Sequence, residues 1–291
     1  MSSVRTIITY ADSEFFKALR SLGWEDGRNV VVHARYSSGD STRFPVFAAE
    51  LVRLKVDLIV VWGTNALAAV KSATPAIPIV MISASDPIAA GLVSNVSRPD
   101  ANVTGVAIVD GLEGKRLQLL KEALPRLTRA AVLVNPERPG AKDLLNQTKR
   151  AAESSGLQLE AFSVSRPDHL RRTFSEMKKA HVHAVLVLTD AMFWAHRADI
   201  AAQAVNSGLA TINPGRDYAA AGGLLSYSAS FEDMARRGAV YVDKIMRGAK
   251  VADLPIEQPE KFELVINMRT TKALGLSVPP EMLLHTDELI Q

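Results

Sequence analysis

The chain has 291 residues, of which 47% are hydrophobic and 22% are charged, and its formal net charge is +3. This composition is typical of a soluble globular protein, and the length favours about two domains over one. Basic residues are interspersed with acidic ones and form no stripe with interleaved aromatics, so no nucleic-acid partner is expected. The absence of cysteine excludes disulfides, thiolate metal sites and cysteine catalysis. No apolar run approaches the roughly 18 residues that a membrane span requires.

The first part of the chain, to about residue 108, alternates between short apolar segments and amphipathic ones. Two apolar segments, 57–62 and 77–82, are nearly uninterrupted and rich in β-forming residues, which is typical of parallel strands buried on both faces. The alanine-rich stretch 66–73 between them predicts a helix, so the three form a β-α-β unit. Similar patterns predict strands at 6–10 and 29–36 and helices at 13–22 and 42–54.

The same order of strands and helices recurs after about residue 108. The predicted helices are 114–124, 142–155, 170–179 and 197–206, and the predicted strands are 130–134, 157–164, 184–188 and 209–212. Two such series predict an α/β protein with two similar lobes, each a doubly wound parallel sheet with right-handed crossovers.

The last part of the chain does not fit a simple tandem of two lobes. A strand at 222–228, a helix at 232–247, a strand at 262–266 and a helix at 270–274 follow the second series. We expect the chain to cross back and forth between the lobes here, forming a hinge and a cleft that can close on a ligand. The expected first lobe is 1–108 plus 229–256, and the expected second lobe is 109–228 plus 257–291.

Small polar residues follow the two central strands of the first lobe. They are Gly63, Thr64 and Asn65 after one strand, and Ser83, Ala84, Ser85 and Asp86 after the next. In open α/β sheets, ligands bind outside the carboxyl ends of the strands, where helix N-termini present backbone N–H groups. The Thr64 hydroxyl, the first-turn N–H groups and Ser85 are candidates to bind a carboxylate, and Asp86 is a candidate for an ammonium group. The alternatives are an ordinary helix cap at Thr64 and a turn that starts at Asp86.

Polar residues also follow three strands of the second lobe, and these should face the same cleft: Asn135, Asp190 and Asn213. Asp190 is the best candidate to neutralise a ligand amine, and its alternative role is to cap the following helix. Phe193 could stack on an aromatic ligand or belong to the core of that helix. Asp217, in the loop before 222–228, could close the cleft.

The sequence offers little support for catalysis. The six histidines show neither metal-ligand spacing with carboxylates nor a Ser/His/Asp arrangement, and no glycine-rich phosphate loop occurs. We therefore expect no catalytic residues, no metal and no cofactor.

Four segments carry a resemblance to a known family: 22–32 (LGWEDGRNVVV), 77–106 (IPIVMISASDPIAAGLVSNVSRPDANVTGV), 222–228 (GGLLSYS) and 254–283 (LPIEQPEKFELVINMRTTKALGLSVPPEML). In their order and spacing they resemble ABC-transporter substrate-binding proteins of the tryptophan/tyrosine-uptake type, which have the type I periplasmic-binding-protein fold. The resemblance implies a monomeric periplasmic receptor that captures a small molecule between two lobes and presents it to an ABC permease in the inner membrane. An aromatic or hydrophobic amino acid is the leading ligand.

Two departures from the family pattern keep other readings open. The chain starts without the signal or lipoprotein segment of the family, which taken literally indicates the cytoplasm. The loop Tyr10–Ser13 is about ten residues shorter than in the family, whose longer loop usually reaches the cleft. The alternatives are a cytoplasmic ligand sensor on the same fold, a paralogue that binds a non-amino-acid aromatic compound, and a doubly wound enzyme. The missing acid/base and cofactor motifs disfavour the enzyme.

Overall fold

Two β-sheets, each in its own unit of the chain, carry the architecture. The computed structural model describes residues 4–8, 13–97, 99, 102–108 and 111–291. The first unit comprises Met1–Asp110 with Ser230–Lys261, and the second comprises Gly111–Ala229 with Phe262–Gln291. The segment 257–261, which we expected in the second lobe, therefore belongs to the first unit.

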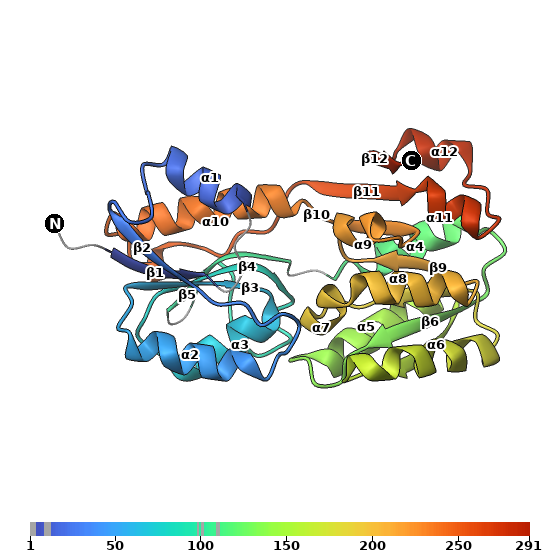
Figure 1. Ribbon diagram of the computed structural model, residues 1–291, viewed down its shortest axis with the longest axis horizontal. Helices are drawn as coiled ribbons and strands as arrows, with labels where there is room; N and C mark the ends of the chain where they lie inside the picture. Colours follow the sequence, from blue (N-terminus) through green and yellow to red (C-terminus); the bar gives the residue numbers. More distant parts are fainter. Residues whose placement is uncertain (1–3, 9–12, 98, 100–101, 109–110) are drawn as a thin grey trace. The chain divides into compact units, whose positions relative to one another are not determined.

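In the described part of the first unit, five parallel strands form a sheet in the order β2-β1-β3-β4-β5. They are β1 (Val4–Ile8), β2 (Val30–Ala34), β3 (Leu58–Trp62), β4 (Ile79–Ser85) and β5 (Val103–Ile108). Helices α1 (Ser13–Ser21) and α10 (Phe231–Met246) cover one face, and α2 (Arg43–Arg53) and α3 (Thr64–Ala73) cover the other (Figure 1). A short 3-10 helix, Val251–Asp253, follows α10. Strand β4 is buried along its whole length and β3 along all but its last residue, as their apolar sequences predict.

In the second unit, the described residues form a sheet in the order β12-β11-β10-β9-β8-β6-β7. Its strands are β6 (Arg129–Val134), β7 (Gln158–Ser163), β8 (Ala184–Val187), β9 (Ala210–Asn213), β10 (Leu225–Ala229), β11 (Phe262–Asn267) and β12 (Glu288–Ile290). Its helices are α4 (Glu113–Ala123), α5 (Ala141–Ser154), the 3-10 helix Pro167–His169, α6 (Leu170–Lys179), α7 (Ala191–Ala195), α8 (Arg197–Asn206), α9 (Arg216–Ala220), α11 (Met268–Ala273) and α12 (Pro280–Leu284).

Two separate cores cover the two faces of this second sheet. Leucines of α4 and α5 pack with residues of α11 and α12 on one face, and side chains from α6 to α9 pack on the other. The sheet is parallel except that β11 pairs with β10 in the antiparallel sense, with Ala229 opposite Phe262. The chain leaves the unit after β10 and re-enters at β11 beside that point, which is why the direction of the strand reverses.

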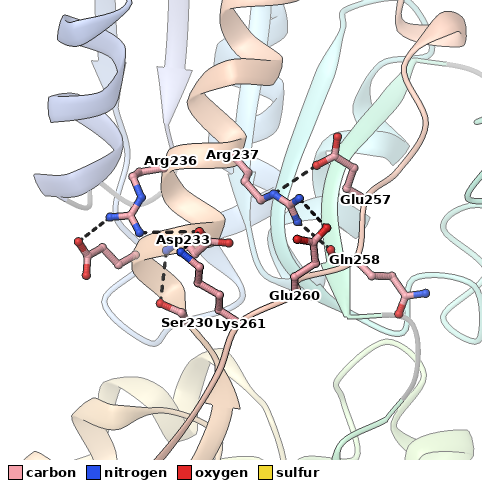
Figure 2. A network of polar contacts seen from close by, with 9 residues as sticks. Ser230, Asp233, Arg236, Arg237, Glu257, Gln258, Glu260 and Lys261 are labelled. Carbon is pink, nitrogen blue, oxygen red and sulfur yellow. Dashed lines mark hydrogen bonds and ion pairs between the residues drawn. The ribbon is translucent and has the colours of Figure 1, made fainter. Parts of the chain in front are cut away.

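A network of charged side chains holds the returning segment 257–261 against α10 (Figure 2). Arg237 contacts Glu257 at 3.4 Å and Glu260 at 3.0 Å, and it donates to the carbonyl of Gln258 at 3.0 Å. Glu257 also exchanges backbone hydrogen bonds with β5, which places it at the edge of the first sheet. These contacts assign the segment to the first unit.

The predicted α/β class with doubly wound parallel sheets is confirmed by this topology. The sequence did not predict the strands β5 and β12, the short helices α7, α9 and α12, or the two 3-10 helices. The predicted strand 6–10 overlaps β1, but its last two residues and the short loop from Tyr10 to Asp12 lie outside the described residues.

Candidate ligand-binding site

In the first unit, a hydroxyl group joins the two strand ends that the sequence singled out. Gly63 lies between β3 and α3 with φ +82, and its N–H donates to Ile82 O at 3.0 Å. The buried Thr64 side chain donates to Ser85 O at 3.1 Å and accepts from Ser85 N at 3.0 Å. The Thr64 proton is therefore used to position the end of β4. The N-cap Gly63 has no side chain to cap α3, so the first turn presents backbone N–H groups beside the half-buried Asn65.

Ser83 interrupts the regular pairing of β4 with β5. The register shifts between Ile82 and Ala84, so Ser83 forms a bulge, and its φ is +58. A left-handed conformation is unfavourable for a residue with a Cβ atom, and such strain is concentrated at functional sites. Ser83 and Ser85 are both about one-twentieth exposed, and Ala84 is fully buried.

Asp86 begins the turn that follows β4. It has φ +43, its N–H donates to Ile108 O at 2.7 Å, and its carboxylate accepts from Ala89 N at 3.0 Å. This is the turn-starting role that the sequence left open as the alternative, and the ammonium-binding role stays a prediction.

In the second unit, Asp190 joins the ends of β6 and β8. Its carboxylate caps α7 by accepting from Met192 N at 2.9 Å and Phe193 N at 3.2 Å. The same carboxylate accepts from the Asn135 side-chain amide at 3.2 Å, and Asn135 in turn accepts from Glu137 N at 3.1 Å. Two of the predicted residues are thus held together as one polar group, with Asp190 only 5% exposed.

Burial raises the pKa of Asp190 above its ordinary value, because removing the carboxylate from water penalises the charged form. The hydrogen bonds from Asn135, Phe193 and Met192 and the positive charge of Arg138 lower the pKa in part. Arg138 is itself buried and donates to Pro139 O at 2.7 Å. The sequence analysis missed it, because an arginine in a loop is normally solvated.

The other predicted residues of this unit differ in their surroundings. Asn213 is buried at the end of β9, and its amide NH2 donates to Thr211 Oγ1 at 3.1 Å and Leu225 O at 3.2 Å. Asp217 is half-buried on α9. Phe193 has no exposed surface and lies in the core, as in the second of its two proposed roles. Its neighbour Trp194 is half-buried and packs edge-on against Tyr218, with ring centroids 5.5 Å apart.

The start of α4 in the same unit carries a buried ion pair that the sequence did not reveal. Arg116 contacts Glu113 at 3.0 Å, and both side chains are no more than 5% exposed. Arg116 also donates from Nε to Tyr227 O at 2.8 Å, on the part of β10 that extends beyond its pairing with β9. Burial lowers the pKa of Arg116. Charged residues in the first turn of a helix are typical of a solvated end, so no sequence signal pointed to this pair.

The described residues contain no group of three or more His, Cys, Asp or Glu side chains arranged to hold a metal ion. None of the helices in the described ranges is long and apolar enough to cross a membrane.

Comparison with known proteins gives a family match and close structural likenesses. The family model of the ABC transporter substrate binding proteins matches residues 9–290. A tyrosine-binding protein of Clostridioides difficile (strain R20291) is 24% identical over 266 residues, which are 91% of this chain and 76% of the relative. An ABC domain from Streptococcus pneumonia, solved in complex with L-Trp, has a TM-score of 0.91 and 24% identity, covering 99% of this chain and 100% of that one. A conserved domain protein from Vibrio cholerae O1 biovar El Tor has a TM-score of 0.92 and 22% identity, with the same coverage.

The structural likenesses confirm the fold, and the family match extends over both units of the chain. The four sequence segments that carried the resemblance all lie within the matched range. The chain therefore belongs to the ABC transporter substrate binding protein family, whose members are binding proteins, and the resemblance drawn from its sequence is confirmed.

Proposed function

We propose that this protein binds an aromatic or hydrophobic amino acid, with an aromatic one as the leading candidate, and delivers it to an ABC permease. The observation that carries the ligand class is Asp190, a buried carboxylate held in place by three hydrogen bonds at the carboxyl end of β8. Two relatives support it: one is described as a tyrosine-binding protein, and another was solved with L-Trp.

Each unit has a distinct role in this proposal. Asp190 attracts the ligand's ammonium group, and Asn135 keeps the carboxylate oriented by donating to it. In the first unit, the N–H groups at the start of α3 and the serines of the β4 end, Ser83 and Ser85, form a group that is suited by itself to bind a carboxylate. Thr64 acts as a positioning residue, because its hydroxyl already bonds both backbone groups of Ser85.

A second candidate ligand is an aromatic carboxylate that lacks an amine. The observation that favours it is Arg138, a buried cation whose charge acts on Asp190 and could attract a carboxylate instead. The same fold occurs in a solute binding protein of R. palustris that was solved with benzoate, at a TM-score of 0.53 and 15% identity.

A ligand screen tests the proposal. Purified protein is heated with phenylalanine, tyrosine, tryptophan, lysine, benzoate or a nucleoside, and the melting temperature is recorded for each. A ligand at 100 times its dissociation constant adds about 2.7 kcal/mol of stability, which is a shift of several degrees. A shift with aromatic amino acids supports the first candidate, and a shift with benzoate alone supports the second. A shift with neither class contradicts both.

Calorimetric titration of two variants then locates the amine-binding group. Asp190→Asn keeps an oxygen that can cap α7 but removes the negative charge, so we expect affinity for the amino acid to fall by more than tenfold. Asp143→Asn removes one negative charge from an exposed position on α5 of the same unit and should leave affinity unchanged. Equal affinities of the two variants would remove Asp190 from the site.

The remaining parts of the proposal concern the cellular role. We propose a periplasmic location, a permease partner in the inner membrane and no catalytic activity, all by family membership. Mass spectrometry of a saturating ligand after prolonged incubation should recover it unaltered, and any conversion would favour an enzyme. Fractionation of cells that express the native gene tests the location.

A further inference from the structure

Three buried polar atoms of the second unit have no hydrogen-bond partner among the described residues. They are Asn213 Oδ1, Tyr218 OH and Ser226 Oγ, on side chains of residues that are 1%, 1% and 0% exposed. Nearly all buried polar groups in native proteins are hydrogen-bonded, to protein or to ordered water. Three unpartnered groups in one unit therefore call for a common explanation.

The three residues come from neighbouring elements at the same end of the sheet. Ser226 on β10 lies beside Asn213 on β9 in the parallel register, so both side chains are on one face. Helix α9, which carries Tyr218, packs on β10. Gly223 lies against Asn213 and the backbone of Tyr218: a Cβ atom there would be 2.6 Å from Asn213 Nδ2 and 2.9 Å from the main-chain oxygen of Tyr218.

The bonding capacity of these groups defines what they can bind. The Asn213 NH2 group faces Leu225 O, which can only accept, so the amide orientation is determined and Oδ1 remains as an acceptor. The hydroxyls of Tyr218 and Ser226 can each donate or accept. An occupant must therefore bring at least one O–H or N–H hydrogen for Asn213, which a bare carboxylate does not have.

We infer that Asn213, Tyr218 and Ser226 form a polar site in the second unit that binds a small O–H or N–H group. In the ligand-free protein the expected occupant is an internal water, because such waters typically make about three hydrogen bonds to buried groups of this kind. The other possible occupant is an ammonium or hydroxyl group of the bound ligand, which would supply the same hydrogen-bond donor. Only this second occupant depends on the proposed function.

Two conservative variants, Tyr218→Phe and Ser226→Ala, test the inference without ligand. If water binds the hydroxyl groups, each removal breaks a real hydrogen bond and should lower the melting temperature by about 2–4 °C. If no water binds the hydroxyls, each one is a buried polar group that carries a desolvation penalty. Its removal then takes that penalty away and leaves the melting temperature unchanged or higher. Tyr241→Phe is the matched control, because the Tyr241 hydroxyl donates to Pro255 O at 2.5 Å and its loss must be destabilising.

The same variants, titrated with L-tryptophan and L-tyrosine, distinguish the two sources. A lower melting temperature with unchanged affinity assigns the site to water. An unchanged melting temperature with affinity reduced at least tenfold assigns it to the ligand. If neither quantity falls in either variant, the inference is wrong. If the wild-type protein binds no amino acid, the proposed function fails, while the melting temperatures still decide the presence of water.

Discussion

Asp190 combines two requirements that normally conflict, burial and negative charge. A carboxylate removed from water is costly unless hydrogen bonds compensate it, and here Asn135 and two backbone N–H groups at the start of α7 compensate part of that cost. The side chain therefore has a structural role in the empty protein as well as the proposed role toward a ligand. Its variants must be judged by stability and affinity separately.

Replacement of Asp190 by alanine should affect both quantities. The loss of the cap on α7 should lower the free energy of unfolding by about 1 kcal/mol. The loss of the charge should weaken binding of an amino acid by more than tenfold, measured by calorimetric titration. Asp143→Asn serves as the control, and an unchanged dissociation constant for Asp190→Ala would show that the ligand amine binds elsewhere.

The raised pKa of Asp190 predicts a pH dependence of binding. The carboxylate becomes protonated at a higher pH than an ordinary aspartate, whose pKa is 3.8. Affinity for an ammonium-bearing ligand should therefore fall as the pH is lowered toward this raised pKa, and Asp190→Asn should not show that fall. A pH series of titrations measures it, and a wild-type affinity that stays constant down to pH ~4 would contradict it.

The raised pKa of Asp190 changes folding stability with pH in the opposite direction to ligand affinity. Because the folded pKa is raised, protonation favours the folded state, and this contribution is complete below the pKa of the unfolded chain. It is lost as the pH rises from the ordinary value of 3.8 through the raised folded pKa. At neutral pH Asp190 is thus destabilising relative to its neutral form, a common property of binding-site residues.

At the scale of elements, the pairing of β4 with β5 depends on a glycine. Gly105 has φ +128, and a Cβ atom there would lie 2.1 Å from Met81 O on the neighbouring strand. The backbone of β4 cannot move away without breaking its pairing with β3, because it is the fourth of five strands. The bulge at Ser83 lies near the end of this strand, so the glycine also supports the candidate site.

Gly105→Ala should therefore lower the free energy of unfolding by about 3 kcal/mol or more, through backbone strain and overlap. Urea denaturation followed by circular dichroism measures this. Gly114→Ala on α4 is the control, because its Cβ atom would make an ordinary contact of 3.6 Å with Ala151. That change should stabilise the helix by up to about 1 kcal/mol, and an equal loss at both positions would contradict the argument.

Helix α10 and the segment 257–261 are joined by Arg237, which contacts two carboxylates at once. Arg237→Gln should cost about 1 kcal/mol of stability, less in high salt, because the side chain is about one-quarter exposed and the pairs are partly screened. Arg172→Gln removes an exposed pair within α6 and should cost less than about 0.5 kcal/mol. Denaturation in low and high salt compares the two, and equal losses would show that the Arg237 network adds nothing.

At the scale of the whole molecule, the chain passes between its two units three times, after residues 110, 229 and 261. The last two passages lie side by side, since Ser230 N donates to Lys261 O at 2.9 Å and Ala229 pairs with Phe262.

Closure of two lobes on a ligand, which the family resemblance implies, stays a prediction. If closure occurs, we expect the radius of gyration measured by X-ray scattering to fall when a ligand saturates the protein.

The sequence by itself determined the class of the fold, most strands and helices, and the family. Short continuous apolar runs such as 57–62 and 77–82 are typical of strands buried on both faces, and polar residues directly after such strands lie at the carboxyl edge of the sheet. Local composition carries that information, so the sequence placed Thr64, Ser85, Asn135 and Asp190 at strand ends, and their contact with a ligand stays a prediction.

Tertiary structure alone decided how these residues are used. Thr64 bonds to Ser85, twenty-one positions later, and Asp190 bonds to Asn135, fifty-five positions earlier, so neither role has a local signal. Strand β5 was missed because Gly105 weakens its strand pattern, although that glycine is required by the backbone of β4. In the sequence, the charges of Arg116 and Glu113 are typical of a solvated helix end. In the structure both side chains are buried, and Arg116 donates to β10. Burial and long-range hydrogen bonding depend on which segments meet in space, and one-dimensional patterns do not record that.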